Sequence, residues 1–181
     1  GFCIEGAGDG ENFGYSVSGN VDVNSDGIDD DVIIGAQTAF ANGKSTAGTV
    51  TVVFGRTTWT SDYIDTSGTG FGFKIMGESE SDHAGWSVSG LGDTNQDGIN
   101  DLILSACNWD KNSTVIDAGR SYVLFGRPRG NWPDIVNLSS VDGIIGFTID
   151  GSEASEFSGY SVGDAGDIDA QLDPLEVRYL V

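Results

Sequence analysis

Short runs of alternating apolar and polar residues recur along this chain, and they predict β-strands. Residues 15–18 (YSVS) and 86–89 (WSVS) alternate with a period of two, which is typical of a strand with one buried face. Residues 32–34 (VII) and 102–104 (LIL) are apolar throughout, as expected of central strands. Polar and Gly-rich stretches between these runs predict loops, and no segment has a helical period.

The strand-like runs belong to larger blocks that repeat at a constant spacing. The pattern GFxIxG occurs at residues 1–6, 72–77 and 146–151, and GYSVSG or a close variant occurs at 14–19, 85–90 and 159–163. A third block, VTVVFGR at 50–56, returns as SYVLFGR at 121–127. The second copy follows the first by 71 residues and the third follows the second by 74, so the chain is a tandem repeat.

Each repeat unit predicts four short strands, in the order GYSVSG, VII or LIL, VTVVFG or SYVLFG, and GFxIxG. Four strands in a unit of this length match one blade of a β-propeller. We therefore predict an all-β chain of tandem four-stranded antiparallel propeller-type blades. It comprises about two and a half units, which are residues 1–71, 72–145 and a partial unit 146–181.

The two ends of the chain predict open blade edges. Gly1 in place of Met indicates a processed or excised piece. Residues 1–6 read as a fourth strand with no blade ahead of it, while residues 159–162 and 176–180 predict the first two strands of an unfinished blade. Unpaired edges favour strand addition, so we expect the N-terminal strand of one copy to dock on the C-terminal blade of the next copy, or on that of an adjoining segment of a longer chain.

An acidic loop follows the first strand of each full unit. Residues 22–30 read DVNSDGIDD and residues 93–101 read DTNQDGIND, with side-chain oxygens at positions 1, 3, 5 and 9 and Gly at position 6. Ca²⁺ takes roughly six to eight oxygen ligands, so these side chains and a backbone carbonyl at position 7 suit it better than Mg²⁺. A helix–loop–helix site is excluded, because position 12 holds Ile33 or Leu104 instead of Glu. The alternative is an Asp- and Gly-rich turn without an ion.

These motifs resemble the FG-GAP repeats of integrin α-chain propellers and of many bacterial and protist surface proteins. The resemblance rests on FGYSVSGNVDVNSDGIDDDVIIGA at 13–36 and GTVTVVFGR at 48–56, and on their copies at 85–106 and 121–127. It implies two Ca²⁺ sites, each in the loop that joins the first two strands of a blade. By position it assigns as ligands Asp22, Asn24, Asp26, the carbonyl of Ile28 and Asp30, and in the second unit Asp93, Asn95, Asp97, the carbonyl of Ile99 and Asp101.

Two of the loops depart from this pattern. The first loop carries an extra acid, Asp31, so either Asp30 or Asp31 can fill the last ligand position. The loop of the third unit, residues 167–175 (DIDAQLDPL), keeps the acids at positions 1 and 3 but loses the acid at 5, the Gly at 6 and the acid at 9. We expect this third loop to bind Ca²⁺ poorly or not at all.

Charge and composition narrow the function further. The chain has 28 Asp and Glu against 8 Lys and Arg, a formal net charge of −20. Such a surface repels phosphate backbones and anionic lipid, which argues against nucleic-acid and membrane roles. Cys3 and Cys107 allow either a disulfide or free thiols. Asn112 and Asn137 begin N-glycosylation sequons, which are compatible with a secreted glycoprotein.

We expect a non-enzymatic role outside the cell or at its surface, with other protein chains, copies of this chain or a glycan as partners. The first hypothesis is a calcium-binding adhesion or protein-interaction module. The alternative is a structural subunit of an extracellular filament or surface assembly, joined head-to-tail through repeat edges. Catalytic motifs are missing and His83 is the only histidine. Trp59, Trp109 and Trp132 suit either stacking on sugar rings or packing between blades.

Overall fold

The computed structural model describes residues 2–28, 30–58, 62–166 and 179–180. Its strands are β1 (Cys3–Glu5), β2 (Ser16–Val21), β3 (Asp31–Ala36), β4 (Thr49–Val53), β5 (Tyr63–Asp65), β6 (Gly72–Met76), β7 (Ala84–Gly90), β8 (Leu102–Ala106), β9 (Arg120–Leu124), β10 (Ile135–Asn137), β11 (Gly146–Asp150), β12 (Gly163–Asp164) and β13 (Tyr179–Leu180). Two 3-10 turns accompany them, η1 (Arg129–Asn131) and η2 (Leu138–Ser140). The all-β prediction is therefore confirmed. In this described part of the chain, no helix has the length and hydropathy to cross a bilayer.

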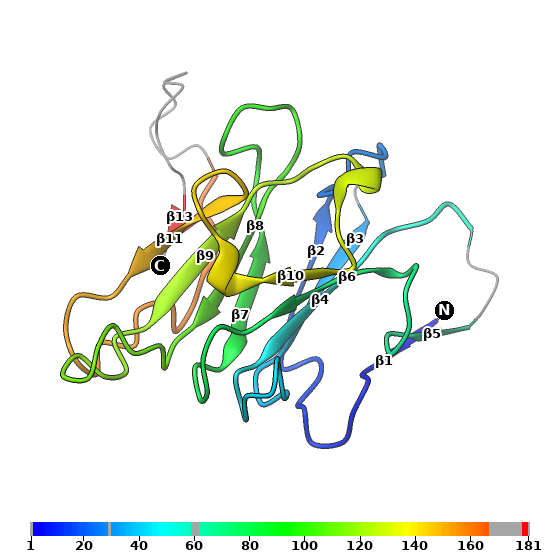
Figure 1. The fold of residues 1–181 in the computed structure, drawn as a ribbon. Helices are drawn as coiled ribbons and strands as arrows, with labels where there is room; N and C mark the ends of the chain where they lie inside the picture. The colour runs from blue at the N-terminus through cyan, green and yellow to red at the C-terminus, as the bar shows by residue number, and fades with distance from the viewer. Residues whose placement is uncertain (1, 29, 59–61, 167–178, 181) are drawn as a thin grey trace.

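The strands form two large sheets that lie side by side (Figure 1). The first has the order β10-β6-β4-β3-β2 and the second has the order β11-β9-β8-β7. All neighbours in these sheets are antiparallel except β10, which joins β6 in parallel. Two small sheets flank them, a parallel pair of β1 with β5 and an antiparallel pair of β12 with β13.

Four strands of each large sheet are those that the repeat predicts. They are β2, β3, β4 and β6 in the first sheet and β7, β8, β9 and β11 in the second, in the same spatial order. The register repeats as well, since Val52 lies opposite Phe73 and Val123 lies opposite Phe147. The GFxIxG strand is the outer strand both times. Thus β6 begins the second repeat unit in the sequence but completes the first sheet in space.

One short strand in each of the first two units, β5 and β10, is not among the strands that the repeat predicts. β5 and β10 come from the connection between the third and fourth strands; β5 pairs with β1, and β10 pairs with β6, the outer strand of the first sheet. The register is the same in both pairs, with Ile64 opposite Ile4 and Val136 opposite Ile75. The prediction that the N-terminal strand has unpaired edges is corrected, because β5 takes one edge of β1. Three-residue strands are too short to show a period of their own.

The third unit is described only in part. Residues 159–162 are predicted as its first strand, but they form a turn and a bend. The strand β12 begins only at Gly163. β13 covers two residues of the predicted second strand, 176–180, and pairs with β12 in antiparallel fashion. The third acidic loop, 167–175, lies outside the described residues.

Apolar side chains pack on both faces of each large sheet, which explains why its central strands are apolar throughout. Along β3, Ile33 enters the core between the two sheets, whereas Ile34 packs with Ile64 of β5 on the opposite face. Along β8, Leu104 enters the same central core, whereas Ile103 packs with Val162 of the third unit. The sheets therefore stack in a row, each covered by the next unit.

Backbone contacts between consecutive units repeat along this row. The carbonyl of Ala47 accepts the N–H of Ala84 at 2.9 Å, and the carbonyl of Ala118 accepts the N–H of Ser158 at 2.9 Å. Gly48 lies beside the first of these bonds with a φ of +81°, and a Cβ there would come within 2.1 Å of the Ala84 oxygen. Only glycine combines this backbone conformation with such a close approach.

Candidate metal sites

The first acidic loop is closed by its own carboxylates. Asp22 accepts the backbone N–H of Asp26 at 3.2 Å and that of Gly27 at 2.8 Å. Asp26 in turn accepts the N–H of Ile28 at 3.1 Å. Ser25 and Gly27 have φ angles of +56° and +82°, so the chain curls around the side chain at position 1. Asp favours this tight turn because its side chain accepts nearby backbone N–H groups, and Gly favours it because it adopts a positive φ without strain.

The second acidic loop has the same conformation. Asp93 accepts the N–H of Asp97 at 3.0 Å and that of Gly98 at 2.8 Å. Asp97 accepts the N–H of Ile99 at 2.9 Å. Gln96 and Gly98 have φ angles of +63° and +89°. Positions 1, 5, 6 and 7 thus make the same hydrogen bonds in both loops, although the residues at positions 2 and 4 differ.

A buried aspartate joins the end of each loop to the rest of its sheet. In the second loop this is Asp101, which accepts the N–H of Thr94 at 2.9 Å and the N–H of Gly126 at 2.8 Å. The hydroxyl of Thr94 also donates to it. Asp101 has no exposed surface, and burial raises its pKa above the ordinary value against the effect of these hydrogen bonds.

Asp31, and not Asp30, is the structural counterpart of Asp101. Asp31 accepts the N–H of Val23 at 2.9 Å and the N–H of Gly55 at 2.8 Å, from the same two positions of the repeat. Asp30 is exposed. The alignment of Asp30 with Asp101 by spacing is therefore one residue out of step, because the first loop has one more residue. Burial raises the pKa of Asp31 to about 6, although its hydrogen bonds lower it.

The Asn at position 3 takes different places in the two loops. Asn24 is fully buried, and its amide donates to both oxygens of Asp31 at 2.8 and 2.9 Å. Its own Oδ1 is buried and accepts no hydrogen bond from the described residues. Asn95 is exposed, and its amide donates to Asp97 at 2.9 Å. The structure thus brings Asn95 together with Asp97, and Asn24 together with the closing carboxylate of Asp31.

The donor atoms of the two loops are all oxygens. Each loop contributes two turn carboxylates, an Asn amide oxygen and a backbone carbonyl at position 7, which are ligand types that Ca²⁺ accepts. Across the described residues, three or more Asp, Glu, His or Cys side chains nowhere gather in a group that could hold a metal. The buried Oδ1 of Asn24 still fits a cation, because leaving such an atom without a partner costs about 1–3 kcal/mol.

An arm from the second unit, residues 127–138, covers the first loop. The N–H of Arg129 donates to the carbonyl of Asn24 at 2.8 Å, and the indole N–H of Trp132 donates to the carbonyl of Val23 at 3.0 Å. These contacts account for the full burial of Asn24, and sequence spacing gives no hint of them. The first loop is therefore covered by residues of a different repeat unit.

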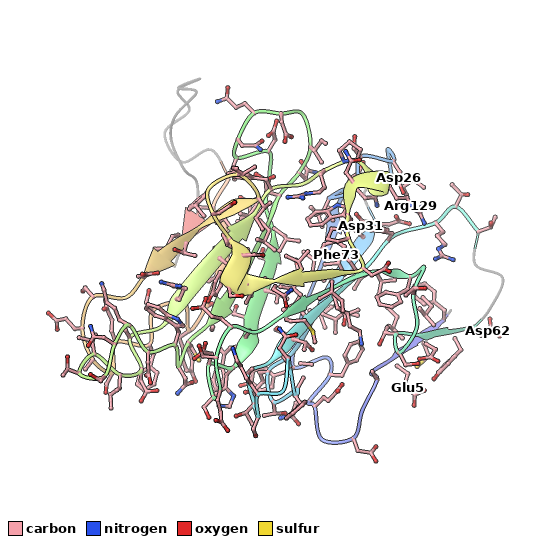
Figure 2. All side chains as sticks on the ribbon, viewed as in Figure 1. Glu5, Asp26, Asp31, Asp62, Phe73 and Arg129 are labelled. Atoms are coloured by element: carbon pink, nitrogen blue, oxygen red, sulfur yellow. The ribbon has the colours of Figure 1, made fainter. Side chains whose placement is uncertain are left out.

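The same arm brings a positive charge to the first loop. The guanidinium of Arg129 lies 3.4 Å from Oδ2 of Asp26, and Figure 2 shows the two side chains together at one end of the first sheet. Arg129 is about half exposed, so this ion pair adds at most about 1 kcal/mol. It nevertheless lies beside a carboxylate that the sequence assigns to a metal.

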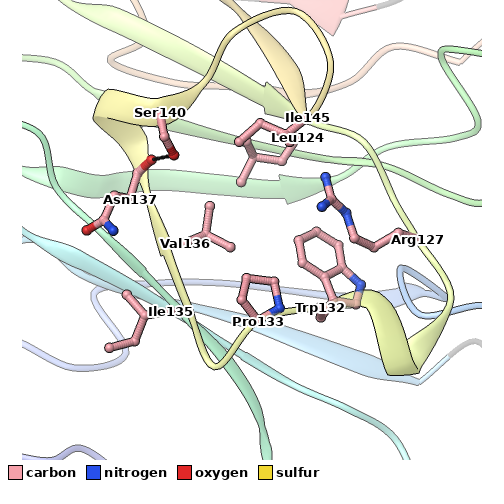
Figure 3. Close-up of a pocket in the computed structure, with 9 residues that line it drawn as sticks. All are labelled: Leu124, Arg127, Trp132, Pro133, Ile135, Val136, Asn137, Ser140 and Ile145. Carbon is pink, nitrogen blue, oxygen red and sulfur yellow. Dashed lines mark hydrogen bonds between the residues drawn. The ribbon is translucent and has the colours of Figure 1, made fainter.

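Under the arm is a cavity of about 230 Å³ (Figure 3). Trp132 and Val136 of the arm and Leu124 and Ile145 of the second unit line it. Val136 and Leu138 of the arm are nevertheless buried in the central core with Leu124, and β10 pairs directly with β6 of the first sheet.

The other residues that the sequence marked for chemistry have structural partners. Trp109 is buried under the guanidinium of Arg120, which lies 3.6 Å from its ring centroid. Trp132 stacks on the ring of Phe73. Both rings thus make packing contacts, and Trp59 lies outside the described residues. Nδ1 of His83 lies 2.9 Å from Oε1 of Gln37.

The cysteines and the sequons differ in exposure. Cys3 is exposed, Cys107 is buried, and both are free thiols; burial raises the pKa of Cys107 to about 11. Asn112 is exposed at the start of a turn, where it accepts the hydroxyl of Thr114 at 2.7 Å. Asn137 is half-buried in β10 and accepts the Nδ2 of an Asn from the first unit at 2.7 Å. Asn112 is the more accessible of the two sequons.

The chain was compared with known proteins at the level of families and of individual sequences. No protein-family model matches it, and no curated protein is significantly similar to it.

Proposed function

We propose that this chain is an extracellular calcium-binding repeat protein whose units are propeller-type blades and act as an adhesion or protein-interaction module. The observation that carries the proposal is the shared hydrogen bonding of the two acidic loops. Both loops fold their carboxylates inward in a protein that already carries a net charge of −20. A divalent cation in each loop offsets the repulsion between those carboxylates.

In the first loop, Asp22, Asp26 and the carbonyl of Ile28 hold the ion. The Ile28 carbonyl accepts the N–H of Asp30 at 2.8 Å and keeps a second lone pair for a cation. The buried oxygen of Asn24 is a fourth donor. Asp30 is exposed and free to turn toward the ion, whereas Asp31 is engaged in closing the loop.

In the second loop, Asp93, Asn95, Asp97 and the carbonyl of Ile99 hold the ion. All three side chains are exposed, so water completes the coordination more readily here than in the first loop. Asp101 closes this loop as Asp31 closes the first. Ca²⁺ supplies fixed positive charge that ties the turn together and does no catalytic chemistry.

A propeller arrangement is supported by the stacking of the sheets. Each large sheet has the same strand order, buries apolar side chains on both faces and is bonded to the next unit by the same backbone contacts. Blades of four antiparallel strands that pack face to face around an axis build a β-propeller. The FG-GAP resemblance of the loops and strands points to the same architecture.

An interaction role is supported by a row of aromatic side chains at one position of the repeat. The rings of Tyr15 and Trp86 have centroids 5.2 Å apart, and those of Trp86 and Tyr160 are 5.3 Å apart. Tyr15 and Tyr160 are 50% and 64% exposed, an unusual degree for large aromatic residues. Exposed clusters of Tyr and Trp are typical of surfaces that bind partners.

Calcium titration of the chelator-treated full chain tests the proposal. We expect two sites with dissociation constants on the order of 10⁻⁴–10⁻³ M, the range of extracellular modules. Asp97→Ala should abolish one site and Asp26→Ala the other, while Asp62→Ala, an exposed acid outside both loops, should leave both. Absence of binding heat in this titration, together with absence of calcium by elemental analysis of the protein before chelation, would contradict the proposal.

A further inference from the structure

The arm at residues 127–138 shows what the outer edge of a large sheet binds. β10 adds to β6 as a parallel strand, and the N–H of Lys74 donates to the carbonyl of Asp134 at 2.9 Å. Trp132 lies flat on Phe73, with ring centroids 3.9 Å apart and planes 11° apart. The arm therefore combines strand addition, an aromatic stack and the bonds to the acidic loop described above.

The first unit makes the same contact with β1. The N–H of Cys3 donates to the carbonyl of Asp62 at 2.8 Å, as Lys74 does to Asp134. The central residue of each added strand is buried, Ile64 at 8% and Val136 at 6% exposure. Two outer strands of this chain thus carry a parallel strand in the same register.

The two arms also share a sequence pattern. Residues 55–65 read GRTTWTSDYID and residues 126–137 read GRPRGNWPDIVN. Both begin with Gly-Arg, contain one Trp, and end in a short strand in which a β-branched residue precedes Asp or Asn. The segment that binds an outer edge therefore has a definite chemistry: basic at its start, aromatic in its middle and a β-strand at its end.

The second sheet has the same surface without the arm. Among the described residues, no strand pairs with the outer edge of β11. Asn95 is exposed, although its counterpart Asn24 has no exposed surface under the arm. Ile149 is partly exposed, although its counterpart Ile75 is completely buried. Within residues 2–166, apart from the gaps named above, no arm lies over the second acidic loop and no strand pairs with the backbone edge of β11.

We infer that the second acidic loop and the outer edge of β11 together bind an arm of this pattern from another repeat unit, as a strand parallel to β11. The N–H of Thr148 takes the part of Lys74, because β11 and β6 have the same register with their inner neighbours. The carbonyls of Thr94 and Asn95 accept hydrogen bonds from the arm, as those of Val23 and Asn24 do in the first loop. Asp97 offers the arm's arginine the same carboxylate that Asp26 does, in a strongly acidic chain.

A second copy of this chain is not the occupant that the structure favours. Its arms are already held, one by β1 and the other by β6. An intramolecular arm also has a high effective concentration at its own edge, so it yields to an exchange only slowly. The partner is therefore a segment of arm chemistry carried by a different unit.

Binding of a labelled peptide to the full chain tests the inference. A fluorescein-labelled peptide of residues 126–141 is titrated with the protein in chelator, so that calcium plays no part, and its anisotropy is followed. We expect saturable one-to-one binding, weakened at least tenfold by Trp132→Ala in the peptide. Thr148→Pro in the protein should weaken binding at least tenfold, because it removes the edge N–H. Thr148→Ala keeps that N–H and should bind like the parent chain.

Absence of saturable binding, or equal binding by the Thr148→Pro chain, overturns the inference. If circular dichroism shows that Thr148→Pro does not fold, hydrogen exchange on the parent chain replaces it, with protection of residues 146–150 expected when the peptide is added. Protection elsewhere would also overturn it. Sedimentation of the protein alone tests whether a second copy occupies the edge. Self-association that the peptide cannot displace would assign the edge to a second copy and overturn the inference.

Discussion

Trp132 lies flat against Phe73, a residue of the first sheet, with 3.9 Å between the ring centroids. The same indole donates to the carbonyl of Val23 at 3.0 Å, and the guanidinium of Arg127 lies 4.7 Å above its ring. One side chain thus ties the arm to a strand of the first sheet and to the acidic loop. The stack joins the arm to that sheet and is not an isolated aromatic pair.

Trp132→Ala should lower the free energy of unfolding by about 2–4 kcal/mol, because it removes a large packed ring and a hydrogen bond. Trp132→Phe keeps a ring on Phe73 and loses only the indole N–H, so we expect a loss of about 1 kcal/mol. Urea unfolding of the three proteins, followed by circular dichroism, measures the difference. Equal losses for both variants would show that the stack adds nothing.

Gly48→Ala should be far more destabilising than Gly43→Ala. Both glycines have positive φ, +81° and +82°, so alanine costs about 1–2 kcal/mol at either position. Only at Gly48 does a Cβ meet an obstacle, the Ala84 oxygen at 2.1 Å; at Gly43 nothing lies within 4 Å. We expect Gly48→Ala to cost at least about 3 kcal/mol in thermal or urea unfolding. Matching losses would contradict the close approach of the two units.

Asp31→Ala should destabilise the chain by about 3 kcal/mol, because it leaves the buried N–H groups of Val23 and Gly55 without an acceptor. Asp30→Ala, one residue away and exposed, should cost less than about 0.5 kcal/mol. Unfolding is measured in chelator, so that any bound metal has no influence. A larger effect at Asp30 would show that Asp30 and not Asp31 closes the loop.

Asp82 should make the protein less stable as the pH rises. Burial raises its pKa to about 7, helped by the nearby charges of Glu78 and Asp110 and opposed by the N–H of Ser79, which donates at 2.9 Å. Below pH about 4 the carboxyl is protonated in both the folded and the unfolded chain. Between pH 4 and 7 the unfolded chain loses this proton first, so stability falls as the pH rises toward 7.

The matched variant for this pH effect is Asp82→Asn, whose amide oxygen still accepts the N–H of Ser79. The difference in unfolding free energy between the variant and the parent chain should grow in favour of the variant from pH 4 to pH 7, by on the order of 3 kcal/mol. Urea unfolding at several pH values measures it. A difference that stays constant with pH would mean that Asp82 titrates normally in the folded protein.

The sequence alone determined the repeat, the order of four strands in each unit and the position of the acidic loops. These features are local, because period-two alternation and Gly at turn positions act within a few residues. The GFxIxG blocks also predicted outer strands, and β6 and β11 confirm this for two of the three blocks.

Only the tertiary structure decided which residues from distant parts of the chain meet. β5 and β10 are too short for a pattern of their own and become strands by pairing with the preceding sheet. Asp31 and Asp30 are equivalent by composition, and the N–H of Gly55 selects Asp31 as the closing acid. Asn24 is buried because an arm from the next unit lies over it. Each of these outcomes depends on partners far away in the sequence, and local spacing carries no information about them.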